Sequence, residues 1–586
     1  MNLLQHNLMF LSFEPSSLSL IFFTAGCTIT AFLLIVALKH QAIRKCFGAL
    51  ISRTVNITLL RFFPIKHVDH AASLPSLPYV FPNGQGNVEK FLRGRANSAR
   101  WASEYGSLYR LWSGISSEVV LTKPAHVEAV FRDSHKHTKA HANDSGFLMD
   151  SLLGSCLGLI SGQPWNAVRS GVEAPFLRSS MRQYARDAQD FTSAFMHRLQ
   201  SDNNAFRQQG TLHPVQDLKL LPILFVARVI YGLLTDEQER ELRDLIPPRE
   251  NIFRTVIGGG ITRFEFSKFL PLPDIRALKR FKDNWARWND RVHANAVKRA
   301  SKADPAPVIA MYKAVEDGKM TREQLLQTLD EILFANIDVT MGGLSWTLVF
   351  LAAHPDVQAA LRSEIQAQCS SSGEDDENIS ARDNRERDAY LLSAWTATPT
   401  LLGACILEAA RLRPLAAFSV PQACPSVRVL DGFEIPAGTN FIIDSYALNI
   451  RDPFWGPDRD RFRPERWLER HKYGRDLRYR YWRFGFGPRT CLGKYLAELI
   501  VRTVVVEVLE NWKIALQPTR PDVEQKGIDK ENASNTSTKA NDVDDGMSWP
   551  WDDELWIHSP QLLLKCEPLK DYFTKERENI SLQSSP

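Results

Sequence analysis

One cysteine, Cys491, lies between two glycines in the segment FGFGPRTCLG (484–493), directly before an apolar helical pattern. A thiolate that binds a metal such as iron must stay deprotonated, and the positive end of a helix with its backbone N–H groups stabilises that charge. Gly487 and Gly493 would let the backbone approach a flat cofactor closely, and Arg489 adds a cation two residues before the sulfur. Taken alone, a cysteine in a glycine-rich turn is more often a buried structural residue.

Two pairs of side chains elsewhere in the chain are spaced to share one helix face. Glu408 and Arg411 lie three residues apart in LEAARLRP, and Trp165 and Arg169 lie four apart in GQPWNAVR. Residues at these spacings are neighbours on a helix and can act together. An isolated acid and base at this spacing are usually a solvated surface pair of little energetic weight. Each pair therefore indicates a site only in combination with the cysteine segment.

An acidic residue, Asp338, lies in the middle of a long predicted helix. The sequence TREQ at Thr321 has the capping-box form and no proline follows before Pro355, which predicts a helix over 321–353. A helix of this length extends roughly 50 Å and must cross the interior of a large domain. Asp338 is a candidate carboxylate for proton transfer. Thr340 supplies a hydroxyl, although it is equally well explained as a packing residue bonded to a carbonyl one turn back.

Together these segments resemble the motifs of the cytochrome P-450 family, and they occur in the family's order. FGFGPRTCLG resembles its haem-binding loop, LEAARLRP its ExxR helix and GQPWNAVR its W-x-x-x-R motif. FRPERW resembles the segment whose arginine, here Arg466, completes a buried ionic cluster with the ExxR pair. The resemblance covers roughly residues 75 to 570. It implies a fold that is mainly α with smaller β-sheets.

The resemblance also implies roles for individual residues. Cys491 would be the axial ligand of the iron in heme b, where the thiolate favours cleavage of the O–O bond of O2. The other residues implied to contact the cofactor are Trp165, Arg169, Phe484, Gly487, Arg489 and Gly493. The residues implied to be structural are Glu408, Arg411 and Arg466. Electrons would come from a separate NADPH-dependent cytochrome P-450 reductase, because this chain has no Gly-rich dinucleotide fingerprint.

The long helix departs from the family pattern A-G-x-D-T-T. Asn336 stands in place of the glycine, and Val339 replaces the alcohol that normally relays protons. Thr340 follows, but one residue is a rotation of about 100° on a helix, so its hydroxyl need not reach the same place. Asp338 and Thr340 remain the candidate catalytic residues.

The segment after the ExxR helix carries a second departure. Gln422 stands where the family commonly offers an arginine to a haem propionate. The segment 415–420, together with parts of a loop expected around 147–152, would line the substrate cavity. Both segments are apolar with few fixed polar groups, which suits a lipophilic small-molecule substrate.

The amino-terminal segment 16–38 holds 23 residues without a formal charge. It covers about 34 Å as a helix, enough to cross a hydrocarbon core of about 30 Å. Basic residues follow it, so the positive-inside rule predicts that the catalytic domain faces the cytosol. We expect a single-pass protein of the endoplasmic reticulum membrane. A cleaved signal peptide is the alternative, but the apolar run is long for one and lacks a basic start.

The predicted organisation is one large domain behind an anchor. We expect an anchor over 1–38, a basic flank and Pro-rich hinge over 39–84, a catalytic domain over 85–570 and a tail over 571–586. Two polar insertions, at about 369–388 and 518–545, are too poor in large apolar residues to be core segments. Short strands are expected within 107–114 and 118–124, followed by a helix that begins at Pro124. A further strand is expected over 553–569, after the second insertion.

The composition narrows the function classes. A net charge of +4 implies no bulk attraction to nucleic acid, and eight scattered cysteines without a CxxC pair indicate neither a disulfide scaffold nor a zinc module. The resemblance favours a monooxygenase that oxidises a lipophilic small molecule in fungal secondary metabolism. A second hypothesis keeps the haem but couples, cyclises or rearranges its substrate without inserting oxygen. A third is a non-catalytic haem protein or membrane scaffold.

Overall fold

The computed structural model describes residues 41–300, 305–369, 387–395, 399–469, 474–517, 549–550 and 556–569. The predicted anchor and the predicted tail lie outside these described residues. The same holds for nearly all of the first predicted insertion and for the whole of the second.

The chain divides into two compact units. The first comprises Met1–Phe63 and Pro78–Pro82, and the second comprises Pro64–Leu77 and Asn83–Pro586. In the first unit, helix α2 (Gln41–Phe62) holds the short 78–82 segment through two side chains. Asn56 accepts a hydrogen bond of 3.0 Å from the backbone N–H of Tyr79, and Ser52 accepts one of 2.9 Å from that of Phe81.

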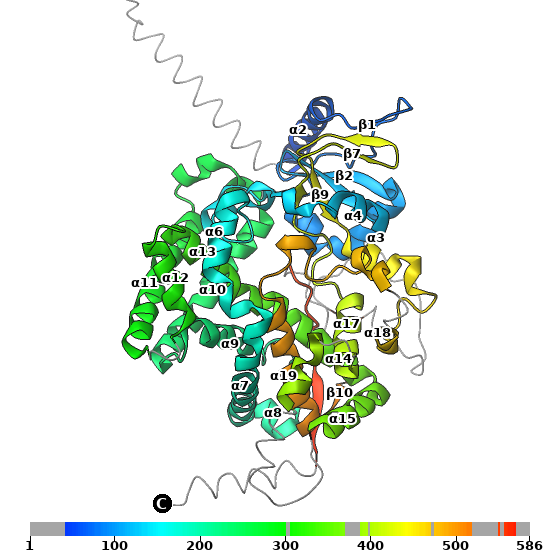
Figure 1. Ribbon diagram of the computed structural model, residues 1–586. Helices are drawn as coiled ribbons and strands as arrows, with labels where there is room; N and C mark the ends of the chain where they lie inside the picture. Colours follow the sequence, from blue (N-terminus) through cyan, green and yellow to red (C-terminus); the bar gives the residue numbers. More distant parts are fainter. Residues whose placement is uncertain are drawn as a thin grey trace, which may run out of the picture. The chain divides into compact units, whose positions relative to one another are not determined.

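The second unit is mainly helical. Its α-helices are α3 (Gly94–Tyr105), α4 (Pro124–Phe131), α5 (Phe147–Leu153), α6 (Gly162–Val172), α7 (Met181–Asp202), α8 (Asn204–Gln209), α9 (Leu220–Tyr231), α10 (Asp236–Gly258), α11 (Pro273–Arg299), α12 (Pro307–Glu316), α13 (Arg322–Ala335), α14 (Met341–Ala353), α15 (Pro355–Cys369), α17 (Leu401–Leu412), α18 (Glu465–Leu468) and α19 (Lys494–Asn511). Figure 1 shows α9 to α13 as one group of packed helices. Helix α19 packs against α7, α14 and α15.

Three small sheets complete the second unit. The strands are β1 (Lys66–His67), β2 (Leu108–Ser113), β3 (Ser116–Leu121), β4 (Thr138–Lys139), β5 (Thr211–Leu212), β6 (Gln422–Ala423), β7 (Arg428–Leu430), β8 (Phe433–Ile435), β9 (Asn440–Ile443), β10 (Trp512–Leu516) and β11 (Leu564–Pro568). The largest sheet has the order β2-β3-β9-β6-β4, with β3 and β9 parallel and the other pairs antiparallel. The two smaller sheets have the orders β1-β8-β7 and β10-β11-β5. Figure 1 shows α3 beside β2 and α4 beside β7.

The long predicted helix is present, with one local distortion. The capping box forms: Thr321 accepts from the Gln324 backbone N–H at 3.1 Å, and the Gln324 side chain accepts from the Thr321 N–H at 2.8 Å. Helices α13 and α14 are joined by the π-helical turn η8 (Asn336–Thr340). Such turns inside α-helices occur frequently at functional sites. The helix ends at Ala353, with His354 as its C-cap, as Pro355 predicts.

This long helix belongs to the core of the protein. Among the described residues, the stretch Arg322–Ala353 is long and apolar enough to cross a membrane, but 67% of its most apolar window is buried inside the second unit. A helix that is apolar on all sides and covered by other helices is typical of the centre of a large domain. It therefore positions Asp338 and Thr340 in the interior.

Two local predictions hold and two need correction. Strands β2 and β3 pair as an antiparallel hairpin, and α4 begins at Pro124 as expected. The segment expected as a loop at 147–152 is instead helix α5, because Gly146 at φ +89° allows the chain to turn into a short helix whose apolar residues are buried. The strand expected over 553–569 is confined, among the described residues, to β11.

Candidate active site

A large internal cavity of about 1030 Å³ lies in the second unit. Its walls come from α10, the long helix, the segment after α17, the cysteine segment and residues 556–557. Most of the lining residues are apolar or aromatic, and charged side chains from several elements also border the cavity. A cavity of this kind suits a bulky, lipophilic molecule.

The cysteine segment forms a tight loop at the cavity wall. The backbone N–H of Cys491 donates to the Phe484 carbonyl at 2.8 Å, which closes the loop three residues before α19 begins. Gly487 has φ +66°, and a Cβ atom there would lie 2.3 Å from the hydroxyl oxygen of Ser134. A Cβ atom at Gly493 would meet no heavy atom within 4 Å. Cys491, which borders the cavity, therefore lies close to the amino end of a helix, where a thiolate is stabilised.

Two of the described cysteines, Cys156 and Cys491, border the cavity. Burial raises the pKa of the Cys156 thiol well above its usual value, and the Glu331 carboxylate beside it raises it further. Burial also raises the pKa of Cys491, but a backbone hydrogen bond from Gly493 and the cation of Lys494 oppose the rise. The pKa of Cys491 is thus raised less than that of Cys156, so Cys491 is the better candidate of the two for a thiolate ligand.

A second group of possible metal ligands lies apart from the cavity. Asp133, His137 and Cys424 bring one ligand atom each within 4.8 Å of one another, but none of the three borders the cavity. The Asp133 carboxylate is already paired with Arg428 at 2.5 Å. Because that guanidinium would repel a metal cation, the candidate site is assigned to Cys491.

The structure brings together the three residues expected at the cofactor's carboxylates. The guanidinium of Arg489 lies 4.6 Å from the centre of the Trp165 ring, and that of Arg169 lies 5.6 Å from it. Arg169 is paired with Glu173 at 2.8 Å, whereas Arg489 donates to the Ile160 carbonyl at 2.7 Å. Burial lowers the pKa of Arg489 to about 10, and Arg169 contributes to that shift.

Two charged residues that sequence reasoning missed border the same wall. Burial lowers the pKa of Lys139 to about 7, and the nearby Arg489 lowers it further. Glu331 accepts a hydrogen bond of 2.9 Å from the Gly158 backbone N–H, and burial raises its pKa. No periodic pattern marks either residue, so the sequence alone could not have placed them here.

This wall fits a flat cofactor with carboxylate groups. Arg169 and Arg489 lie beside Lys139, whose charged form a bound carboxylate would favour, so this edge of the cavity suits negatively charged groups. Carboxylates buried among guanidinium groups form strong charge-assisted hydrogen bonds. The residues present therefore fit haem, with its iron at the sulfur of Cys491 and its propionates at the cationic wall.

The middle of the long helix also borders the cavity. Asn336, Asp338, Val339 and Thr340 all contribute to its lining. The Thr340 hydroxyl donates to the side-chain oxygen of Asn336 at 2.7 Å, so it bonds to a side-chain amide one turn back and not to a backbone carbonyl. Burial raises the pKa of Asp338, whose carboxylate accepts a hydrogen bond of 2.8 Å from Trp556. Sequence reasoning did not identify Trp556.

The expected substrate-lining segments border the cavity in part. After α17, the bordering residues are Arg413, Pro414, Leu415, Ala416, Phe418, Ser419, Val420 and Gln422. Gln422 is buried in β6, where it pairs with Phe441 of β9. From the segment predicted as a loop at 147–152, Met149 of α5 borders the cavity.

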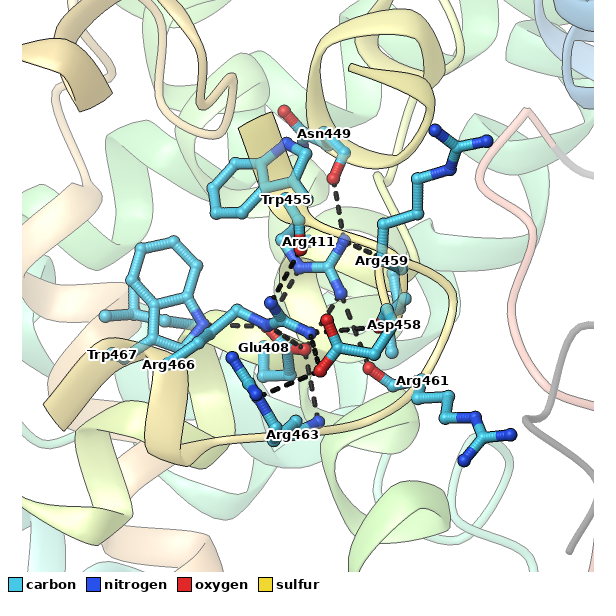
Figure 2. A network of polar contacts seen from close by, with 12 residues as sticks. Glu408, Arg411, Asn449, Trp455, Asp458, Arg459, Arg461, Arg463, Arg466 and Trp467 are labelled. Carbon is cyan, nitrogen blue, oxygen red and sulfur yellow. Dashed lines mark hydrogen bonds and ion pairs between the residues drawn. The ribbon is translucent and has the colours of Figure 1, made fainter. Parts of the chain in front are cut away.

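Glu408 lies at the centre of a buried network of polar contacts (Figure 2). Its carboxylate accepts from Arg411 at 2.8 and 2.9 Å, from Arg466 at 2.8 Å and from the Trp467 indole at 2.8 Å. Arg411 also donates to the Asn449 carbonyl at 2.9 Å. The pair spaced for one helix face is therefore fully buried, and it ties α17 to α18 and the segment between them.

Comparisons with known proteins agree with this arrangement. The family model for cytochrome P-450 matches residues 86–535. The chain is 44% identical over 504 residues to the cytochrome P-450 monooxygenase aclC of Aspergillus oryzae, covering 86% of this chain and 94% of that protein. It is 39% identical over 545 residues to the cytochrome P-450 monooxygenase asaD of Aspergillus flavus, covering 93% and 96%. A zebra fish cytochrome P-450 solved with progesterone has the same fold, with a TM-score of 0.58, 19% identity and coverage of 81% of this chain and 99% of that one.

Proposed function

Because this chain belongs to the cytochrome P-450 family of haem-thiolate monooxygenases, we propose that it oxidises a lipophilic small molecule in the cavity bordered by Cys491. Cys491 is proposed as the axial ligand of heme b. The observation that carries this proposal is the position of the thiol. It opens onto a large apolar cavity at the amino end of α19, with a cationic wall along the same cavity.

Haem, when bound, supplies the chemistry that activates O2. Arg169, Arg489 and Lys139 would hold its propionates, and the Trp165 ring lies against the two guanidinium groups. Phe484, Gly487 and Gly493 shape the loop that presents the sulfur, since the Phe484 carbonyl closes it and the glycines leave room for close approach.

Asp338 and Thr340 are proposed to serve proton delivery. Inserting one oxygen atom of O2 into a C–H bond consumes two electrons and two protons, and the second oxygen atom leaves as water. The electrons come from NADPH-dependent cytochrome P-450 reductase. Because burial raises the pKa of Asp338, its carboxyl group can hold and release a proton closer to neutral pH than an exposed carboxyl group.

We also propose where the protein works. Its fungal relatives and the uncharged segment at 16–38 support a single-pass protein of the endoplasmic reticulum membrane that acts in fungal secondary metabolism. The basic residues after that segment support an orientation with the catalytic domain on the cytosolic side.

One observation favours a second candidate function. Val339 borders the cavity where the family places an alcohol, so oxidative coupling, cyclisation or rearrangement without oxygen insertion is the alternative. A non-catalytic haem protein or scaffold is the third possibility, and the apolar cavity beside the cysteine argues against it.

The experiment combines a deletion strain with labelled oxygen. Metabolites that accumulate after deletion of the gene are incubated with the purified enzyme, the reductase, NADPH and ¹⁸O₂. The proposal predicts a product that carries one labelled oxygen atom for each oxidation. A product without label supports the alternative, and the absence of any NADPH-dependent product overturns both enzymatic functions.

A further inference from the structure

The carboxylate of Asp338 is bound by a residue from the far carboxyl-terminal part of the chain. The indole Nε1–H of Trp556 donates to Oδ2 of Asp338 at 2.8 Å, and both residues border the cavity. Within the part of the chain that the structure describes, the Asp338 carboxylate makes no other hydrogen bond. This contact therefore fixes one carboxylate oxygen of the proposed proton carrier.

The Trp556 ring is itself held in place by two aromatic neighbours. Phe91 approaches it edge-on with ring centres 6.3 Å apart, and Phe253 approaches it edge-on at 5.7 Å. Edge-to-face pairs at such separations are favourable and restrict ring orientation. Phe91 belongs to the π-helical turn η1 (Val88–Leu92) and Phe253 to α10, so two separate elements define the position of the indole.

The backbone next to Trp556 is anchored as well. The Trp346 indole donates to the His558 carbonyl at 2.7 Å, and the His558 ring lies 2.9 Å from the Leu92 carbonyl oxygen. These contacts join residues 556–558 to α14 and to η1. The indole N–H is thus directed at Asp338 by packing and backbone anchoring together.

The chemistry of an indole makes this contact directional. An indole N–H donates a hydrogen bond but accepts none, so Trp556 cannot relay a proton itself. It favours the ionised form of the carboxylate, whereas burial disfavours that form. The hydrogen bond therefore orients Oδ2 and leaves Oδ1 as the oxygen that exchanges protons.

We propose that Trp556 is a positioning residue for Asp338, whose indole N–H orients the carboxylate for proton delivery during oxygen activation. This inference rests on the proposed monooxygenase function. Because Val339 replaces the alcohol that the family usually has, proton delivery depends more strongly on the Asp338 carboxylate. Loss of its orientation should then divert reducing equivalents from product to hydrogen peroxide.

The test uses the full-length haem protein with its reductase and a substrate from the deletion strain. Trp556→Phe keeps an aromatic ring between Phe91 and Phe253 but removes the N–H. We expect an unchanged reduced CO-bound spectrum. The amount of product formed per NADPH consumed should fall several-fold. The amount of hydrogen peroxide should rise correspondingly, and the solvent isotope effect on product formation should change. Trp549→Phe is the control, because Trp549 packs on Trp346 and does not border the cavity.

Asp338→Asn provides the second arm of the test. If Trp556 acts through Asp338, the double variant should couple no worse than Asp338→Asn alone, because the two changes remove one function. Fully additive losses, or wild-type coupling in Trp556→Phe, would overturn the proposal. If Trp556→Phe lowers the haem content, benzothienylalanine can be placed at position 556 instead. It keeps the size of the indole ring but lacks the N–H, so it tests whether loss of this donor alone reduces product formation per NADPH. A wild-type enzyme that forms no oxygenated product would overturn the monooxygenase function itself, which is a distinct outcome.

Discussion

The side-chain oxygen of Asn336 accepts a hydrogen bond of 2.7 Å from the hydroxyl of Thr340, one turn further along the same helix. The amide nitrogen of Asn336 donates in turn to the Ile332 carbonyl at 2.6 Å. The hydroxyl proton of Thr340 therefore has a fixed direction, and both residues border the cavity. Asn336, which replaces the family's glycine, thus orients the hydroxyl that follows the missing alcohol.

Removing either member of this pair should impair proton delivery. We expect Asn336→Ala and Thr340→Val each to lower the fraction of NADPH recovered as product several-fold, and the double variant to be no worse than Thr340→Val. Thr347→Val is the control, because its hydroxyl bonds to the Gly343 carbonyl and does not border the cavity. Unchanged coupling in Thr340→Val would show that the hydroxyl only packs the helix.

Replacing Glu408 should destabilise the protein strongly. Glu408→Ala leaves the guanidinium groups of Arg411 and Arg466 buried without their carboxylate, which costs about 3–5 kcal/mol. The expected result is a large loss of folded, haem-containing protein, measured by absorbance and thermal unfolding. In the control, Asp290→Asn removes the half-exposed pair with Arg322 and should cost less than about 1 kcal/mol. Equal effects of the two changes would contradict the role of the network.

Local patterns predicted much of this site because they follow from backbone spacing. The capping box at Thr321, the helix end at Pro355 and the face shared by Glu408 and Arg411 depend on residues at most four apart. Contacts made by tertiary folding left no such signal. Trp556 meets Asp338 across 218 residues, and no periodicity in the sequence connects them.

Helix α5 shows why a short element is hard to predict. It spans only two turns, from Phe147 to Leu153, and it follows a glycine. Both features are typical of a loop, so the sequence predicted one. Burial of Leu148, Met149, Leu152 and Leu153 against other elements stabilises the helix. Those contacts come from the tertiary structure.

The backbone of the cysteine loop should tolerate no side chain at Gly487. Gly487→Ala combines a φ of +66° with a Cβ atom 2.3 Å from the Ser134 hydroxyl oxygen. Gly318→Ala is the matched control, since Gly318 has φ +70° but nothing within 4 Å, and its cost is about 1–2 kcal/mol. In thermal unfolding we expect Gly487→Ala to cost more than this control, and Ser134→Ala to remove the excess. If Gly487→Ala alone destabilised the protein no more than Gly318→Ala does, the close contact between position 487 and Ser134 would be contradicted.

The stability of the protein should depend on the protonation of Glu507 in α19. Burial, reinforced by the carboxylate of Glu510, raises the pKa of Glu507 to about 7. Because its pKa is raised in the folded protein, Glu507 contributes fully to stability at pH values below its pKa in the unfolded chain. This contribution is lost as the pH rises through about 7. Glu507→Gln stays neutral, so its stability relative to wild type should rise between pH 5 and pH 8, by at most about 3 kcal/mol. Unfolding measured across that range checks this, with the exposed Glu128→Gln as control. If the difference in unfolding free energy between Glu507→Gln and wild type did not change with pH, the raised pKa would be contradicted.

The reduced, CO-bound absorption spectrum tests the central claim most directly, because it reports whether a thiolate ligates the iron. We expect the wild-type protein, Cys156→Ser and Cys424→Ser to show the thiolate-type Soret band, and Cys491→Ser to lose it. A colourless wild-type protein, or a Cys491→Ser variant that keeps the thiolate band, would contradict the assignment of Cys491 as the ligand.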